Sequence, residues 1–197
     1  VAALTNGALG AIWLNEFHYD NAGGDIDEGV EIAANFVMDA SLLEVHAYNG
    51  SSSQLNVYSS WDMTDFGFTE VDGGSLIWFV GAGSIQNGAP DGLAIVYDGA
   101  VIQFISYEGS PFTAATGPAA GMTSVDLGIS ESSSTAVGTS LQLTGTGEQY
   151  SDFAWTGGEA ATWGSLNAGQ VLGAVPAPGV LALLGLAGIA SRRRRRH

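Results

Sequence analysis

LAIVYDGAVIQFISY, residues 93–107, decides the fold class of this chain. Two runs rich in β-branched and aromatic residues flank Asp98-Gly99, the pair best suited to a type I′ turn, because both central residues of that turn need positive φ. The stretch therefore predicts a β-hairpin. Asn49-Gly50 and Asn87-Gly88 predict further turns.

Short runs with strand periodicity continue on both sides of this hairpin. They are IWLNEFHY (12–19), GVEIAANF (29–36), LLEVHAY (42–48), SLIWFV (75–80), TSLQLTG (139–145) and DFAW (152–155). In the first run Ile12, Leu14 and Phe17 are expected on apolar faces, and the continuous apolar run 75–80 is expected to be a central strand. No segment ahead of the C-terminal tail has a helical period. About eight such strands predict an antiparallel β-sandwich or barrel.

Charge and cysteine content exclude several classes of function. Residues 1–191 contain all 20 Asp and Glu but no Lys or Arg, so this part carries −20 while the whole chain carries −15. Such a surface should repel nucleic acids, which proteins bind with Lys and Arg. The absence of Cys rules out disulfides, thiol catalysis and Cys-type metal sites. The acids either serve solubility alone or include a cation site.

Carboxylates concentrate in NEFHYDNAGGDIDEGVE, residues 15–31. The spacing of these acids is not that of an EF-hand, and the main interpretation is that they are solvated loop residues. The alternative is a Ca²⁺ site with Asp20, Asp25, Asp27 and Glu28 as its candidate ligands, because Ca²⁺ prefers six to eight oxygen ligands. Asp91, within NGAPDG (87–92), either joins a site or only belongs to a turn.

Two further chemistries have candidate residues in the body. Glu16, His18 and Asp20 alternate, so they are expected on one strand face, where the acids would raise the pKa of His18 and orient it as a base. No G-x-S-x-G elbow accompanies it, and we predict no catalytic residue. Aromatic rings either stack on sugars or fill the core; the tryptophans are Trp13, Trp61, Trp78, Trp155 and Trp163.

The C-terminal tail has three parts: AVPAPG (174–179), the apolar run VLALLGLAGIA (180–190) and SRRRRRH (191–197). We predict one short hydrophobic helix, shorter than the roughly 20 residues of a usual span, whose adjacent positive charges stay on the cytoplasmic side of the inner membrane. Its apolar residues are Val180, Leu181, Leu183, Leu184, Leu186 and Ile189, and its cytoplasmic anchor is Arg192, Arg193, Arg194, Arg195 and Arg196. Residues 1–11, VAALTNGALGA, are predicted to be the end of a signal peptide, with a loop or first strand as the alternative.

This tail resembles the PEP-CTERM sorting signal of Gram-negative bacteria. The motif positions are Val175, Pro176, Ala177 and Pro178, with Ala where the family has Glu. The resemblance implies processing by an exosortase-type enzyme, followed by release or attachment at the cell surface, often beside exopolysaccharide. A plain tail anchor is the alternative.

The body resembles the bacterial lamin-tail-like domain (LTD). The residues that carry this likeness include LNEFHYDNAGGD (14–25), IQNGAPDGLAIVYDGAVIQFISYEG (85–109) and GTSLQLTGTGEQYSDFAWTG (138–157). The resemblance implies an immunoglobulin-like β-sandwich that often accompanies extracellular nucleases or sits on exported surface proteins. The family supplies no catalytic residues, and no nuclease domain is expected in the body.

Together these patterns predict an exported, non-catalytic surface or matrix protein. The expected parts are a signal-peptide remnant (1–11), an all-β lamin-tail-like sandwich (12–170), a Pro-containing linker with the sorting motif (171–178), and the helix with its Arg tail (179–197). Expected partners are an exosortase-type enzyme, the inner membrane, and exopolysaccharide or surface proteins. One alternative is a Ca²⁺- or carbohydrate-binding adhesion module, and another is a hydrolase with a site near His18.

Overall fold

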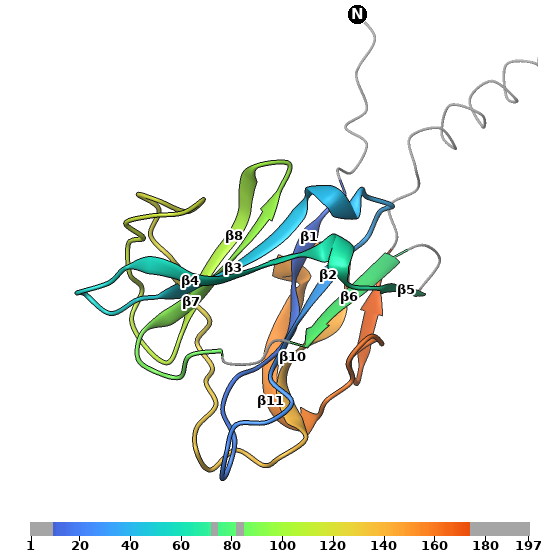
Figure 1. Cartoon of the computed structure of the whole chain (residues 1–197). Helices are drawn as coiled ribbons and strands as arrows, with labels where there is room; N and C mark the ends of the chain where they lie inside the picture. The colour runs from blue at the N-terminus through green and yellow to red at the C-terminus, as the bar shows by residue number, and fades with distance from the viewer. Residues whose placement is uncertain (1–9, 72–74, 82–84, 174–197) are drawn as a thin grey trace, which may run out of the picture.

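The structure, a computed structural model, describes residues 10–71, 75–81 and 85–173, which form two packed β-sheets (Figure 1). Helical structure within these ranges is limited to three short 3-10 turns, Ala40–Leu42, Met63–Asp65 and Tyr150–Asp152. The strands are β1 Ile12–His18, β2 Gly29–Ala34, β3 Leu43–Asn49, β4 Asn56–Asp62, β5 Phe68–Val71, β6 Ser75–Gly81, β7 Asp91–Tyr97, β8 Ala100–Tyr107, β9 Val125–Asp126, β10 Thr139–Gly147, β11 Phe153–Ala160 and β12 Gln170–Leu172. The all-β prediction is confirmed.

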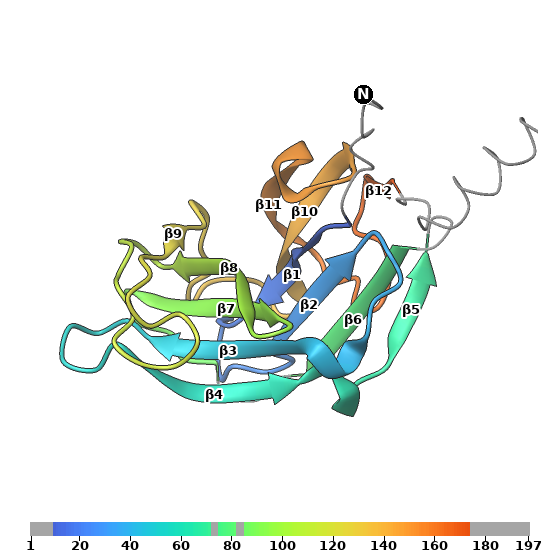
Figure 2. The same cartoon turned by 90° about the horizontal axis from the view of Figure 1, so that it is seen from above.

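The first sheet has the order β11-β10-β1-β2-β6-β5 with β12 beside β10, and the second has the order β4-β3-β7-β8-β9. Their strands cross at an angle (Figure 2). The run 75–80 lies inside the first sheet, between β2 and β5, as its apolar sequence indicates. Two pairs, β10–β12 and β8–β9, are parallel. The expectation of a purely antiparallel sandwich is wrong there, because each of these short strands returns by a long connection rather than a hairpin.

The hairpin predicted from residues 93–107 is β7–β8. Asp98 and Gly99 have φ of 49° and 73°, the left-handed conformations that a type I′ turn requires. Gln103 pairs with Ile95 and Val101 pairs with Val96, so Ile102 between them is the extra residue of a β-bulge. The turn formed as predicted, and the bulge reverses the face of the sheet to which the later side chains of β8 point.

Strand β1 also contains a β-bulge near its middle. Leu14 pairs with Ile32 and Glu16 pairs with Glu31, which leaves Asn15 as the extra residue. A bulge moves every later side chain to the opposite face. Leu14 and Phe17 consequently both join the core between the sheets, whereas Glu16 faces outward from that core.

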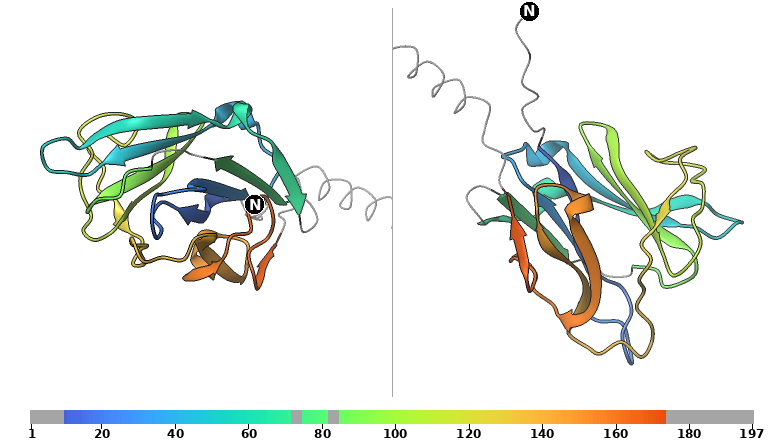
Figure 3. Two further views of the ribbon diagram at one scale, coloured as in Figure 1. Left: turned by 60° about the horizontal axis from the view of Figure 1, so that its bottom comes forward. Right: turned by 180° about the vertical axis from the view of Figure 1, so that it is seen from behind.

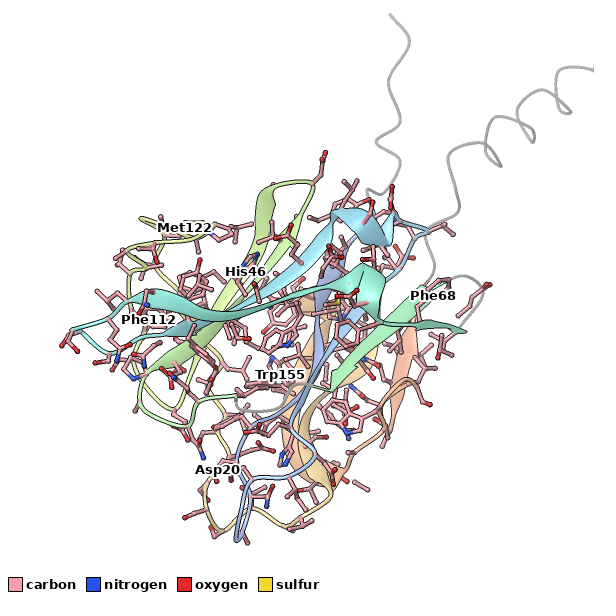
Figure 4. All side chains as sticks on the ribbon, in the orientation of Figure 1. Asp20, His46, Phe68, Phe112, Met122 and Trp155 are labelled. Atoms are coloured by element: carbon pink, nitrogen blue, oxygen red, sulfur yellow. The ribbon has the colours of Figure 1, made fainter. Side chains whose placement is uncertain are left out.

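The main core lies between the two sheets. Leu14, Val45 and Leu93, from β1, β3 and β7, are fully buried in it. The rings of Tyr19 and Tyr107 close one end of this core, with their centroids 4.5 Å apart. Trp155 extends from β11 toward the same interior (Figure 4). Trp13 is fully buried outside this core and stacks on Phe153, with the ring centroids 5.6 Å apart. Trp61 and Trp163 are partly buried.

The first sheet curls back over its own outer face, so that β1 and β2 lie between β3–β4 on one side and β10–β11 on the other (Figure 3). The residues after β11, 161–173, cross this outer face, and we call them the closing segment. Their backbone and side chains bond to β1, β2 and β10. As a result both faces of β1 and β2 are buried, including polar positions.

Candidate functional site

Two carboxylates face each other in the buried space beneath the closing segment. Glu16 on β1 and Glu31 on β2 are cross-strand partners, and both are 0% exposed. No Lys or Arg occurs within residues 1–191 to neutralise them. Buried carboxylates must therefore be held by hydrogen bonds or by protons.

Glu16 accepts hydrogen bonds from both sides of the curled sheet. Its Oε1 accepts from Ser140 Oγ at 2.6 Å and from the Thr162 N–H at 2.9 Å, and its Oε2 accepts from Thr162 Oγ1 at 2.8 Å. Gln142 Nε2 adds a longer bond of 3.3 Å. Burial raises the pKa of Glu16, although these donors oppose the shift. The carboxylate thereby ties the closing segment to β1 and β10.

Glu31 has fewer donors. Its Oε1 accepts from Asn15 Nδ2 at 2.8 Å and its Oε2 accepts from the Gly164 N–H at 2.7 Å. Burial, with a contribution from the charge of Glu16, raises the pKa of Glu31 to about 8. At neutral pH the pair consequently holds a proton, and one net negative charge is removed from the interior.

Asn167 closes a fork between β1 and β10. These two strands pair at Glu16–Gln142 and Phe17–Leu141, and toward Asn15 and Leu143 they diverge. Asn167 Nδ2 donates to the carbonyl oxygens of Asn15, at 3.0 Å, and Leu143, at 2.9 Å. One side chain of the closing segment thus satisfies two backbone acceptors that the diverging strands leave open.

His18 forms a buried ion pair with Glu131, at 2.8 Å between Nδ1 and Oε1. Its Nε2 faces Asn21 Oδ1 at 3.2 Å and the carbonyl oxygen of Ile26 at 3.1 Å. Burial lowers the pKa of His18, but the hydrogen bond and charge of Glu131, with Asn21 and Ile26, raise it more. Acceptors at both ring nitrogens favour the imidazolium form, which donates two hydrogen bonds.

Glu131 also holds the loop that follows β1. Its Oε2 accepts from the N–H groups of Tyr19 at 2.7 Å and Asp20 at 3.1 Å. The acid beside His18 is therefore Glu131, not Glu16 or Asp20 as the alternation suggested. The reason is tertiary: the chain brings residue 131 onto the end of β1, while Glu16 turns toward Thr162 and Asp20 lies beyond the strand. With both ring nitrogens engaged in hydrogen bonds, His18 has a structural role.

A cavity of about 430 Å³ lies beside this ion pair. Its lining comprises His18, Asp27, Glu28, Gly81, Gly138, Thr139, Ala161 and Trp163. Glu28 Oε2 accepts from the Ile85 N–H at 3.1 Å, so that carboxylate has a structural partner. An indole, acids and a hydroxyl at one cavity are groups that a sugar can contact.

The four candidate Ca²⁺ ligands are divided between two places. Burial and the charge of the neighbouring Asp25 raise the pKa of Asp20, and Asn87 Nδ2 donates to Asp25 at 3.0 Å. Asp20 lies in the loops at one end of the sandwich (Figure 4). Asp27 and Glu28 line the cavity beside His18 instead. Within the described ranges no group of three or more His, Asp or Glu could hold a metal ion.

A polar cavity of about 360 Å³ surrounds the loop before β7, and Asn49, Gln86 and Asp91 contribute to it. Burial raises the pKa of Asp91 to about 6, although the Gly50 N–H donates to its Oδ1 at 3.1 Å. Asp91 pairs opposite Asn49 at the end of β3. It belongs to this loop and not to the group around Asp20 and Asp25.

The sorting motif Val175–Pro178, the apolar residues Val180–Ile189 and the arginines Arg192–Arg196 lie outside the described residues. The described chain ends at Gly173, whose N–H donates to the Gly147 carbonyl at 2.8 Å. Across the ranges 10–71, 75–81 and 85–173, no helix is long and apolar enough to cross a membrane.

No family model, no curated protein and no solved structure matches this chain.

Most of the buried partners carry no local sequence signal. Glu131 stands in a Ser-rich loop and is separated from His18 by 113 positions. Thr162, Gly164 and Asn167 lie in a segment whose sequence is typical of a loop. The available signal was that Glu16 and Glu31 occupy strand positions with no basic residue in the body to pair with them, which requires donors from elsewhere.

Proposed function

We propose that this chain is a non-catalytic binding or structural module of an exported surface or matrix protein, with a lamin-tail-like, immunoglobulin-like sandwich and an exosortase-type sorting tail. The observation that carries the non-catalytic part is the use of His18. The ion pair with Glu131 and the acceptors at Nε2 occupy both ring nitrogens, so no ring nitrogen is left to take a proton from a substrate.

The position of the tail supports the sorting part of the proposal. Within the described residues, the last backbone hydrogen bond of the body is donated by Gly173, and the four-residue sorting motif begins at Val175. A processing enzyme that acts at the motif would thus meet a folded body immediately upstream. Residues 1–191 carry a net charge of −20, and the five arginines follow them. This asymmetry favours export of the body, with the arginines retained in the cytoplasm.

The test is the mass of the mature protein from a Gram-negative host that carries an exosortase. We expect a product that has lost Arg192–Arg196, and accumulation of the longer precursor when Pro176 and Pro178 are replaced by Ala. Pro111→Ala, in an exposed loop, is the matched control and should be processed normally. Full-length protein in the cytosol, still carrying the arginines, would end the proposal.

A second candidate is carbohydrate binding at the cavity beside His18. The observation that favours it is the presence of Trp163, Thr139 and Asp27 around one space of about 430 Å³. A glycan array would test it, with Trp163→Ala expected to abolish any signal and Trp61→Ala, outside the lining of this cavity, expected to keep it. An array without a single bound glycan would remove this candidate.

A further inference from the structure

The polar cavity before β7 contains a carboxylate that is half satisfied. Asp91 lines this cavity and is 4% exposed. Its Oδ1 accepts from the Gly50 N–H at 3.1 Å, whereas its Oδ2 has no hydrogen-bond donor among the described residues. Because a buried carboxylate needs donors on both oxygens to keep its charge, Oδ2 has room for a donor that comes from outside the body.

The free oxygen of Asp91 borders open space inside the cavity. Gly88 is another residue of the lining. A methyl group added at Gly88 would have Asp91 Oδ2 as its only neighbour within 4 Å, at 3.6 Å. The space above Gly88 thus leads directly to the charged oxygen.

The amide side chains of the same lining are held by other partners. Asn49 Nδ2 donates to Gln86 Oε1 at 2.7 Å, and Asn49 Oδ1 accepts from the Ser51 N–H at 2.9 Å. Asn87 Nδ2 donates to Asp25 at 3.0 Å. Among the described residues of the lining, Asp91 is the only charged one, so it determines which ligand the cavity favours.

Every titratable group that faces Asp91 in the described part of the chain is an acid. The hydroxyl groups of Tyr58 and Tyr107 feel its charge from β4 and β8. Glu108, which follows β8, accepts from the Gly88 N–H, and burial, with the charges of Asp20 and Asp91, raises its pKa. Residues 1–191 contain no Lys or Arg. The local potential therefore favours a cation supplied by another molecule.

The geometry selects one kind of cation. A guanidinium group pairs best with both oxygens of a carboxylate, but Gly50 already holds Oδ1 of Asp91. Ca²⁺ prefers six to eight oxygens, and the described ranges contain no group of three or more His, Asp or Glu that could hold a metal ion. An ammonium group is a compact point charge that needs one carboxylate oxygen.

The burial of Asp91 also restricts what can carry the ammonium group. The described lining contains no aromatic ring on which the pyranose of an amino sugar could stack. An unbranched stem of four carbons, as in lysine, can bring an ammonium group to a buried oxygen. The chain contains no Lys of its own, so a second copy cannot supply one.

We propose that this cavity binds a lysine side chain of a partner protein. The ε-ammonium group donates to Asp91 Oδ2, and the stem passes over Gly88. This inference goes beyond the proposed function, because it assigns the body a class of partner. It concerns the body alone and depends neither on the sorting tail nor on the carbohydrate candidate.

The probe is Nα-acetyl-lysine N-methylamide, titrated into the ¹⁵N-labelled full chain at low ionic strength. The amide signal of Gly50, which donates to Asp91, should shift saturably, with a dissociation constant on the order of 10 mM for so small a ligand. The Nε-acetylated form has lost the charge and should bind at least about tenfold more weakly. The arginine analogue and methyl glucosaminide should also bind more weakly than the lysine probe.

The pH dependence separates this site from general attraction to an acidic protein. Burial raises the pKa of Asp91 to about 6, and the ammonium group binds the ionised carboxylate. The affinity should therefore fall about tenfold from pH 7.5 to pH 5, as Asp91 takes up a proton. Glu108→Gln should keep this pH dependence, because Glu108 bonds to the backbone of Gly88 and not to the ligand.

Asp91→Asn is the informative variant, since its amide oxygen can still accept from the Gly50 N–H. We expect the affinity to fall at least about tenfold and the pH dependence to disappear. Asp98→Asn, in the exposed β7–β8 turn, makes the same charge change and should bind like wild type.

Gly88→Ala tests the site without a change of charge. Gly88 has no positive φ, and the added methyl group would occupy the space beside Asp91 Oδ2, so binding should weaken about fivefold or more. Gly24→Ala is its matched control and should bind like wild type. If Asp91→Asn does not fold, Gly88→Ala carries the test. The absence of a saturable shift, equal binding of the acetylated, arginine or glucosaminide ligand, or equal affinities of a variant and its matched control would each overturn the proposal.

Discussion

Glu31 should make this fold less stable at alkaline pH, and Glu31→Gln should remove that dependence. Burial and the neighbouring Glu16 raise the pKa of Glu31 from 4.5 to about 8. Between these values the folded state holds a proton that the unfolded state has released. Because the folded pKa is the higher one, the stability is fully present below about pH 4.5 and is lost as the pH rises through about 8.

The size of the effect follows from the same shift. At about 1.4 kcal/mol per pKa unit, ionisation of Glu31 in the fold costs roughly 5 kcal/mol, an upper figure because water entry relaxes buried charges. We therefore expect wild type to lose about 3 to 5 kcal/mol of unfolding free energy through this group between pH 5 and pH 9. A glutamine keeps an oxygen for the Gly164 N–H and cannot ionise.

Urea unfolding at pH 5, 7 and 9 measures this difference. The gap between Glu31→Gln and wild type should shift in favour of the variant by at least about 2 kcal/mol from pH 5 to pH 9. Glu70→Gln, at an exposed position of β5, removes a charge without desolvation and should follow wild type at every pH. Parallel curves for wild type and Glu31→Gln would refute the reasoning.

Three further substitutions test other parts of the fold. Glu131→Gln breaks the buried pair with His18 and should lower the free energy of unfolding in urea by about 3 kcal/mol. His46→Gln removes the more exposed pair with Glu44 and should lower it by under about 1 kcal/mol, so similar losses would contradict a structural role for the His18–Glu131 pair. Gly99→Ala should lower the free energy of unfolding by about 1 kcal/mol, because φ of this residue is 73°, although an added methyl group would meet open space. Gly24 has equally open space and no positive φ, so Gly24→Ala should leave thermal unfolding nearly unchanged. Asn167→Asp removes both donors at the fork and should cost at least about 3 kcal/mol, with loss of amide protection in β12 as its signature; unchanged hydrogen exchange would disprove the role of this side chain at the fork.

Local sequence predicted the elements well, because turns and strand periods are short-range properties. The Asp98-Gly99 turn formed as expected, since positive φ is a preference of the two residues themselves. The run 75–80 forms an interior strand, as predicted from its continuous apolar sequence, which is also a local property. The bulges at Asn15 and Ile102 were not predicted, because each depends on which strand lies opposite.

The candidate sites were predicted only in part. His18 was singled out correctly as a histidine beside an acid, but the acid is Glu131, which loop closure brings to it. Asp20, Asp25, Asp27 and Glu28 are neighbours in the sequence, yet the turn at residues 21–28 sends them to two different places. The cavity beside His18 is lined by residues of β1, β6 and three loops, which no local pattern brings together.

The sequence by itself determined that the body is all-β, that it has no base to pair with its acids, and that every arginine follows the apolar run at its end. These are properties of composition and of spacing along the chain. The tertiary structure decided which acids are buried and what each one bonds, because Glu31 meets Gly164 and His18 meets Glu131 only after strands far apart in the chain have packed. Burial, and with it the protonation of these groups, is a property of the folded environment and not of the residue type.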